Sequence, residues 1–301
     1  MIKHLARATL TPLLKHIPTD RKWLRPFYRT TQLQLKEEYY VSPRLPATFS
    51  GLSLAYAADI HFGSYLNQER ALKVVSQIQA FETDLIVLGG DYGEDARTAE
   101  AFFDLIPPFP ENIPVLAAIG NHDHMGAGAN IARLMEKMRA KGVTPLRNEV
   151  WQLSREGKTL AFCAPDDILA GFPDFEPLIE GTRQADFVIF MPHSPDLIPE
   201  AHKAGLSFDL ALCGHTHGGQ IAPGGRSIYA SSRYGDRYRM GWIKEEGSDI
   251  FISCGVGTSV LPMRIGTLPE IHRFTLSSEN KRSAGAALTS SPETPDLNSC
   301  A

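Results

Sequence analysis

Five apolar runs in this chain each end on side chains that bind metal ions well. With their polar ends they read LSLAYAADIH, DLIVLGGD, IPVLAAIGNHD, ADFVIFMPH and FDLALCGHTH. Short apolar runs of this kind are typical of buried strands. Side chains two apart on a strand point to the same side, and open α/β sheets keep their ligand sites at the carboxyl ends of strands. We therefore expect these polar ends to form one site.

Helical patterns follow the first three runs. Apolar residues recur at helical spacing over 67–81 and 129–140, and a further helix is predicted over 97–106, where two prolines end it. Residues 31–41 alternate like a strand with one wet face, and the second half of the chain is richer in strands. This order predicts an α/β fold, a four-layer sandwich of two packed mixed β-sheets flanked by helices.

Length and composition indicate one catalytic domain with a segment at each end. The chain has 301 residues, 43% of them hydrophobic, which is enough for one large core. Residues 1–30 hold seven Lys or Arg against one acid, a net charge of +6, and are predicted to be partly amphipathic. The catalytic domain is predicted over 31–276, and the Ser- and Pro-rich tail 277–301 is predicted to be disordered.

The net charge and the cysteines narrow down the binding partners and the cellular compartment that we expect. A net charge of −4 argues against nucleic-acid binding, and the four cysteines form no CxxC pair, which favours a reducing compartment. No apolar run approaches the roughly 20 residues of a spanning helix, and no secretory signal is evident. We expect a cytoplasmic protein without an evident protein partner. Residues 1–30 could bind the inner face of an anionic membrane or pack on the domain as short helices, and both alternatives stay open.

The polar strand ends supply seven candidate metal ligands. Two carboxylates, one amide oxygen and four imidazoles can fill two near-octahedral divalent sites if one carboxylate bridges them. This mixture of hard oxygen and borderline nitrogen suits manganese, our first choice, and also iron or zinc, better than calcium. The candidates are Asp59, His61, Asp91, Asn121, His193, His215 and His217.

The ordered motifs DxH, GGD, GNHD, a lone His and GHTH resemble the calcineurin-like metallophosphoesterase family over about residues 50–276. The resemblance implies that family's fold and hydrolysis of a phosphoester by in-line attack of a hydroxide that bridges two metals. It also implies how the ligands divide between the metals. Asp59, His61 and His217 would hold the first, Asn121, His193 and His215 the second, and Asp91 would bridge.

The same resemblance assigns catalytic roles beside the metals. His122 matches the family histidine that contacts the phosphoryl group and protonates the leaving oxygen. Many members carry a carboxylate three residues after the bridging Asp, and it orients this histidine. Glu94 occupies that position here and Asp95 follows it, so both stay candidates for the orienting role.

Further stretches resemble one bacterial subgroup, which contains general phosphodiesterases and the UDP-2,3-diacylglucosamine pyrophosphatases of lipid A synthesis. They are LRNE, GHTHGGQI and GVGTSVLPMRIGTLPEI. The subgroup implies a phosphodiester or pyrophosphate bond, with a lipid-linked nucleotide sugar as one substrate. A general phosphodiesterase or phosphomonoesterase of a small substrate is the alternative. Arg233, Arg237 and Arg264 are candidates to hold a second phosphate. The alternatives are a structural ion pair at the second sheet for Arg264 and a solvated surface position for Arg233 and Arg237. A non-catalytic scaffold is a further alternative, but no candidate metal ligand is missing.

Overall fold

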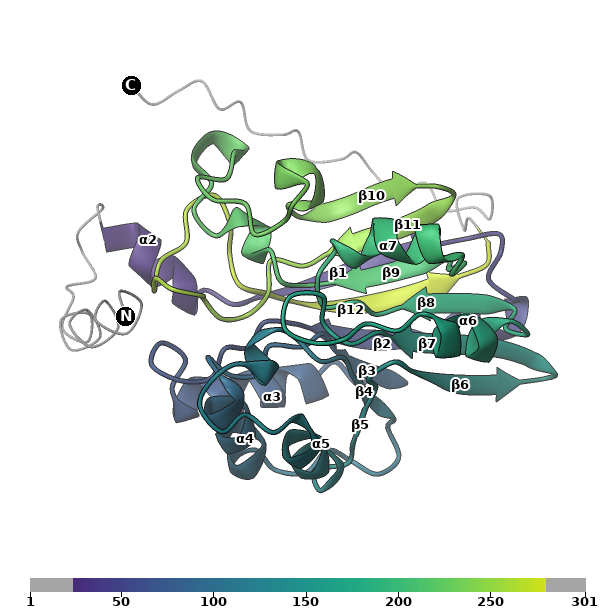
Figure 1. Ribbon diagram of the computed structural model, residues 1–301, viewed down its shortest axis with the longest axis horizontal. Coiled ribbons are helices and arrows are strands. Elements are labelled where there is room, and N and C mark those ends of the chain that lie inside the picture. Colours follow the sequence, from purple (N-terminus) through teal and green to yellow (C-terminus); the bar gives the residue numbers. More distant parts are fainter. Residues whose placement is uncertain (1–23, 280–301) are drawn as a thin grey trace, which may run out of the picture.

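Two six-stranded β-sheets form the centre of the structure, a computed structural model that describes residues 24–279 (Figure 1). The first sheet has the order β1-β12-β2-β3-β4-β5 and the second β10-β11-β9-β8-β7-β6. The first is made of β1 (Gln34–Val41), β12 (Glu270–Ser277), β2 (Ser53–Ala57), β3 (Leu85–Leu88), β4 (Val115–Ala117) and β5 (Val143–Pro145). The second is made of β10 (Gly241–Glu245), β11 (Ser248–Ile252), β9 (Leu210–Cys213), β8 (Phe187–Phe190), β7 (Lys158–Ala164) and β6 (Glu149–Arg155).

Both sheets are mixed, as predicted. Strands β2 to β5 run parallel, and β12 is antiparallel to β2. In the second sheet β11, β9, β8 and β7 run parallel, while the edge strands β10 and β6 are antiparallel to their neighbours. Each sheet therefore has a block of parallel strands whose carboxyl ends lie at a common edge.

Helices cover the outer faces of the sheets and complete the predicted four layers. Helices α3 (Gln68–Gln79), α4 (Ala96–Leu105) and α5 (Ile131–Arg139) lie on the first sheet, and α6 (Glu176–Thr182) and α7 (Leu197–Ala204) on the second (Figure 1). One apolar cluster lies under each helical layer and a third lies between the sheets. The predicted architecture is therefore confirmed.

The three predicted helices form within two residues of their expected bounds, because each has a side-chain cap. The side chains of Asn67, Asp95 and Asn130 each accept a hydrogen bond from a backbone N–H of the first helical turn. Such caps satisfy donors that have no partner inside the helix. Asp95 and Thr98 form a reciprocal capping box at the start of α4.

Strand β1 is present where predicted, but two of its charged side chains face inward beside the buried Tyr40. Leu35 and Tyr39 are exposed, while Lys36 and Glu38 lie against the strand's neighbours. The reason is a buried group of charges centred on His272 of β12. Its ring nitrogens lie 3.2 Å from Glu270 and 3.3 Å from Glu38, and Lys36 bonds the other oxygen of Glu270.

This buried histidine predicts a pH-dependent stability. Burial alone would lower the pKa of His272, but the carboxylates of Glu270 and Glu38 outweigh it and raise the pKa. Charged His272 therefore stabilises the fold fully below its unfolded pKa of about 6.5, and the contribution is lost as pH rises through the raised folded pKa. We expect His272→Gln to cost about 3–5 kcal/mol at pH 6 and progressively less at alkaline pH.

Chemical denaturation of wild type and variant across pH measures this difference. His202→Gln is the matched control, because His202 is itself largely buried but its carboxylate partner Glu246, 3.7 Å away, is exposed, and a pair with an exposed carboxylate contributes little. A cost of His272→Gln that does not change with pH would contradict the charged state assigned to this histidine.

The ends of the chain are described only in part. Helix α2 (Arg25–Tyr28) contacts the domain through the backbone, where the Arg264 N–H donates to the Pro26 carbonyl at 2.8 Å. Residues 1–23 and 280–301 lie outside the described residues, so the amphipathic, membrane-binding and disorder predictions remain predictions. Across 24–279, no helix combines the length and the apolar content needed to cross a membrane.

Candidate metal centre

The candidate ligands lie where parallel strands of both sheets end. Asp59 and His61 follow β2, Asp91 follows β3 and Asn121 follows β4, while His193 follows β8 and both His215 and His217 follow β9. Asp59 and His61 lie within reach of His217 from the other sheet, and Asp91 within reach of His193 and His215. The packing of the two sheets therefore brings residues far apart in sequence into one centre.

Most of the candidate ligands share an unusual backbone conformation. Five of the seven candidates have positive φ: Asp59 (54°), His61 (48°), Asp91 (57°), His215 (69°) and His217 (52°). Residues other than glycine rarely adopt this left-handed region, and such residues cluster at functional sites, where the surrounding structure holds them. These turns point the side chains of successive strands at one another.

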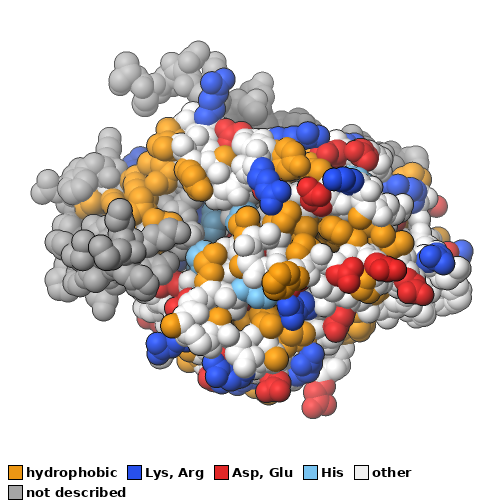
Figure 2. Space-filling view, viewed as in Figure 1, with side chains coloured by type: hydrophobic (Ala, Val, Ile, Leu, Met, Phe, Trp, Pro, Cys, Tyr) orange, Lys and Arg blue, Asp and Glu red, His pale blue; other side chains and the backbone are white. Residues whose placement is uncertain are grey.

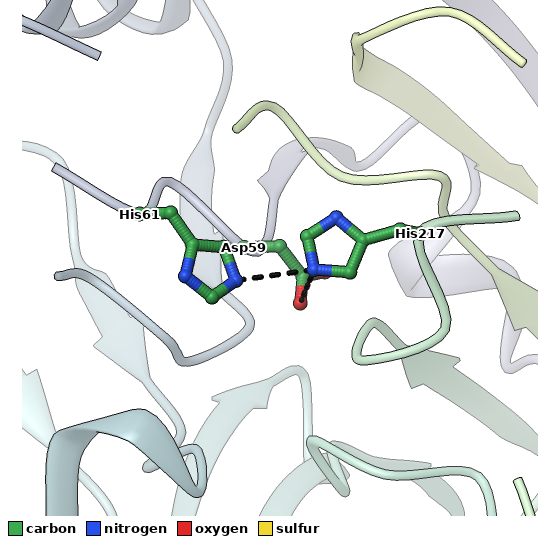
Figure 3. Close-up of side chains that lie close together, drawn as sticks. All are labelled: Asp59, His61 and His217. Carbon is green, nitrogen blue, oxygen red and sulfur yellow. Dashed lines mark hydrogen bonds and ion pairs between the residues drawn. The ribbon is translucent and has the colours of Figure 1, made fainter. Parts of the chain in front are cut away.

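A first group of donors combines Asp59, His61 and His217 (Figure 3). The Nε2 atoms of His61 and His217 lie 3.1 Å apart, and His217 Nε2 is 3.5 Å from Asp59 Oδ1. All three side chains are buried. Two imidazole nitrogens facing each other beside a carboxylate need a proton or a cation between them, so this geometry fits a metal ion.

A second group combines Asp91, His193 and His215. His193 Nδ1 donates to the Gly89 carbonyl at 2.7 Å, which leaves the Nε2 lone pair 3.2 Å from Asp91 Oδ2. His215 Nε2 donates to the Ser231 carbonyl at 3.0 Å, which leaves Nδ1 free to act as a ligand. Metal-binding histidines typically donate their other nitrogen in this way.

Asn121 adds an oxygen donor to the centre. Its side-chain Oδ1 is buried and accepts no hydrogen bond from the described part of the chain. A buried acceptor without a partner costs about 1–3 kcal/mol, and this oxygen is a ligand type that divalent cations accept. Together with the two histidine groups, Asn121 makes the donor set fit a divalent metal centre.

Two glycines allow the backbone to approach the carboxylates closely. A Cβ at Gly214 would lie 2.5 Å from Asp59 Oδ2, and a Cβ at Gly120 would overlap Asp91 Oδ1. Only a residue without a side chain fits at these positions. The glycines of the GNHD and GHTH motifs thus leave room for the carboxylates of Asp59 and Asp91, two of the candidate metal ligands.

Burial and neighbouring charged groups shift the pKa values of side chains in this centre. Burial raises the pKa of Asp59. Burial and the neighbouring His61 lower the pKa of His217 well below its usual range. Neutral imidazole is the form that binds a metal ion, and a divalent cation at the centre would favour the ionised carboxylate.

His122 lies at the edge of the centre and lines the same cavity as Asp91 and Asn121. Its backbone N–H donates to Asp91 Oδ1 at 2.8 Å, and its Nδ1 donates to a backbone carbonyl, that of Glu94, at 2.8 Å. The Glu94 carboxylate accepts hydrogen bonds from Ser64, and the Asp95 carboxylate caps α4. The carboxylate expected to orient His122 is thus replaced by a main-chain oxygen.

The three candidate arginines lie outside the lining of this cavity. Arg264 is fully buried and donates to the backbone carbonyls of Cys254 and Gly255. This differs from the expected substrate contact, because a guanidinium without accessible surface cannot reach a phosphate in solvent. The side chains of Arg237 and Arg233 are about half exposed. Arg237 pairs with Glu245 at 2.9 Å, and Arg233 lies 3.9 Å from Asp196.

Two supporting residues had no assigned role from sequence. The Asp123 carboxylate accepts backbone N–H bonds from Gly120, Asp91 and Tyr92, at 2.9–3.0 Å, and so ties the end of β3 to the end of β4. Gln220 follows the GHTH motif and binds the loop at 259–261 through three hydrogen bonds. Both residues lie inside or beside the motifs, but nothing in residue type or spacing signals what they hold.

Comparison with known proteins agrees with this site. A family described as calcineurin-like phosphoesterase matches residues 52–219. The uncharacterized metallophosphoesterase YkuE of Bacillus subtilis is 31% identical over 252 residues, which cover 82% of this chain and 87% of YkuE. An uncharacterized metallophosphoesterase of Aquifex aeolicus is 27% identical, covering 80% and 90% of the two chains. Phosphodiesterase YaeI of Escherichia coli is 26% identical, covering 74% and 81%.

The family match spans more than half of the chain and includes Asp59, Asp91, Asn121, His193 and His217. The Asp and His side chains of this set are buried, and the two sheets bring their donor atoms close to one another. The chain therefore belongs to the calcineurin-like phosphoesterase family, as a metal-dependent phosphoesterase.

Proposed function

We propose that the chain hydrolyses phosphodiesters with two divalent metal ions held between the ends of its sheets. The observation that carries this proposal is the position of Asp91. Its Oδ2 lies 3.6 Å from His61 Nε2 on one side and 3.2 Å from His193 Nε2 on the other. A carboxylate placed between two groups of imidazoles is what a bridging ligand requires.

The donors divide naturally between two ions. One ion would be held by Asp59, His61 and His217, the other by Asn121, His193 and His215, with Asp91 shared. Manganese remains our first choice, with iron or zinc as alternatives. When bound, the ions would lower the pKa of a water molecule and neutralise a phosphoryl group.

The chain's own groups then position the substrate and move one proton. The Asp91 carboxylate fixes the backbone N–H of His122, and the Glu94 carbonyl fixes its ring through Nδ1. A proton on Nε2 of this ring can pass to the leaving oxygen, a transfer worth about 10²–10⁴-fold. His122 therefore has the anchoring that a general acid needs.

The identity of the substrate is a finer proposal. A phosphodiester is supported by the similarity to phosphodiesterase YaeI. The resemblance of LRNE and GVGTSVLPMRIGTLPEI to the lipid A subgroup adds UDP-2,3-diacylglucosamine as a candidate, and the apolar part of the cavity could accommodate acyl chains. Within residues 24–279, the cavity lining contains no arginine that could hold the second phosphate of that compound. The general phosphodiesterase is therefore the form of the proposal that we favour.

Metal removal tests the proposal. We expect the purified protein to contain two divalent ions per chain and to cleave bis-p-nitrophenyl phosphate. Chelation should abolish cleavage, and adding back manganese, iron or zinc should identify the ion that restores it. A panel of phosphomonoesters, phosphodiesters and acylated and deacylated UDP-glucosamine ranks substrates by kcat/KM. Cleavage that survives complete metal removal would overturn the proposal.

A further inference from the structure

We infer that the cavity beside the metal centre binds an apolar group esterified to a single phosphate. The inference rests on the proposed phosphodiesterase function and names the class of diester it acts on. The cavity measures about 510 Å³ and is lined by Asn121, His122 and His217 together with apolar side chains. The reacting phosphate and its substituent would therefore lie in one continuous space.

Four exposed apolar side chains line this cavity. Met125, Leu169, Ile228 and Tyr229 all line it and expose 40%, 51%, 73% and 78% of their surface. They come from three separate loops, at 125–130, 165–175 and 220–235. Figure 2 shows histidine side chains in a hollow with hydrophobic side chains on both sides. Contiguous exposed apolar surface of this kind marks a binding site.

One apolar wall is held in place by the metal-binding loop itself. Gln220 donates to the carbonyls of Ser259 and Leu261 and accepts from the Ser259 N–H, all at 2.9 Å. Between them Val260 adopts φ = +62°, a conformation that is a true outlier for a β-branched residue. Strain of this kind persists where the surrounding structure enforces it. The wall is therefore a built feature, coupled to His217 through the same loop.

The loop that carries Leu169, another residue of the cavity lining, is also held in place by hydrogen bonds. The Asp167 carboxylate accepts the backbone N–H of Leu169 at 2.7 Å. The preceding Asp166 is buried and bonds His124 and Arg147 at 2.7 and 2.8 Å. These bonds fix the turn that presents Leu169 to the cavity. Leu169 is exposed because the loop holds it there, and not because the loop lacks structure.

The charge of the lining limits the substrate to one phosphate. Among residues 24–279, no Lys or Arg lines this cavity. A second phosphate would have to lose solvent without a cationic partner, which is costly. A phosphodiester carries a single negative charge, which the metal centre can neutralise, and its substituent can enter the apolar part of the cavity. Nucleotide diphosphates fit this lining poorly.

An alkyl series with a constant leaving group tests the inference. Methyl, butyl and hexyl p-nitrophenyl phosphates react at the same phosphorus and release the same phenolate. Burying one methylene is worth up to about fourfold in kcat/KM, so we expect at least about a tenfold rise from methyl to hexyl. Methylphosphonate and hexylphosphonate, which carry no ester bond to hydrolyse, should show the same ranking as inhibitors.

Three exposed positions supply variants that should not disturb the core. Leu169→Ser and Tyr229→Ser should flatten the dependence on chain length. Phe172→Ser is the matched control, because Phe172 is 81% exposed in the same loop as Leu169 but does not line the cavity. It should keep the full dependence. Adding a second phosphate between the hexyl and p-nitrophenyl groups should lower kcat/KM.

Several results would overturn the inference. Equal kcat/KM along the series in an active enzyme refutes the apolar site while the phosphodiesterase function stands. A chain-length dependence that survives both serine variants, or a preference for the diphosphate, refutes it as well. If no ester is cleaved, the methyl ester included, the phosphodiesterase proposal itself fails.

Discussion

Replacing Asp91 with asparagine is expected to remove metal from both sites and to abolish turnover in a protein that still folds. The asparagine side chain has the same size and can keep one oxygen for the His122 N–H, which donates to Asp91 Oδ1 at 2.8 Å. It cannot supply the negative charge that faces both His61 and His193. Loss of this charge should weaken the binding of both metal ions at once.

The loss of activity expected for Asp91→Asn is larger than the loss expected when a residue that only supports a metal ligand is replaced. Removing an outer partner of a metal ligand typically costs 10–100-fold in affinity or activity. Asp91 is shared by both histidine groups, so we expect the loss of kcat/KM on bis-p-nitrophenyl phosphate to be greater than about 100-fold. Elemental analysis should show fewer than two ions per chain under conditions that saturate the wild type.

A control variant separates the effect of Asp91→Asn on metal binding from the general effect of replacing one carboxylate. Asp186 pairs with Lys158 at 2.7 Å near the protein surface, so Asp186→Asn should retain both ions and full turnover. Circular dichroism and thermal unfolding check that the Asp91 variant is folded. Two bound ions and a near-normal rate in Asp91→Asn would remove this residue from the bridging position.

The fold could be predicted because its signals are local. Apolar runs that end in glycine and polar residues mark the central strands, and Asn67, Asp95 and Asn130 sit where helix caps are favoured. Helices α6 and α7 were not predicted individually, because they have only seven and eight residues. So short a segment does not establish a helical period.

The inner face of β1 illustrates what local patterns miss. Alternation predicted a strand, but the apolar residues Leu35 and Tyr39 point outward and Lys36 points inward. The partner that reverses the faces is Glu270, 234 residues further along the chain. The contact that decides which face of β1 points inward is made with a residue far away in the sequence. The alternation of the eight residues of β1 therefore cannot show which face that is.

The candidate site divides in the same way. The seven candidate ligand positions follow from where strands end, and the structure brings these ends together. What supports them is nonlocal or made by the main chain: the Glu94 carbonyl on His122, and the Ser231 carbonyl on His215. Every residue has a carbonyl, so residue type cannot signal these contacts. The role of Arg264 stayed open in the sequence for a related reason, since an arginine that binds carbonyls looks the same in sequence as one that binds phosphate.

Replacing His122 with asparagine should lower kcat by about two to four orders of magnitude while both metal ions stay bound. The ring is anchored by the Glu94 carbonyl, which can only accept, so Nδ1 must carry a hydrogen. When the ring is doubly protonated, Nε2 is the nitrogen that can give its proton to the leaving oxygen, and the ring is left neutral with Nδ1–H still on the Glu94 carbonyl. Asparagine keeps the backbone bond to Asp91 but has no proton to transfer.

The structure offers a competing role for this histidine, and metal content decides between the two. His122 lies within reach of His61 and Asp91 as a third group that could hold an ion. If His122 is a ligand, the variant should lose metal together with activity. If it is the general acid, metal content stays at two ions and only the rate falls.

Leaving groups provide a second readout of the acid role. A p-nitrophenolate leaves with little help from a proton, whereas an alkoxide requires one. The His122→Asn variant should therefore lose less on bis-p-nitrophenyl phosphate than on a dialkyl phosphate. An equal loss on both substrates would count against proton transfer by His122.

Two neighbouring carboxylates supply matched controls, because both were candidates to orient His122. Glu94→Gln removes the charge of a side chain that holds Ser64, and leaves the carbonyl on His122 in place. Asp95→Asn exchanges one good helix cap for another at α4. Both variants should keep kcat within about twofold, since neither changes the oxygen that anchors the ring. If kcat of either variant falls nearly as far as that of His122→Asn, the carboxylate replaced in that variant orients His122, and the main-chain oxygen does not.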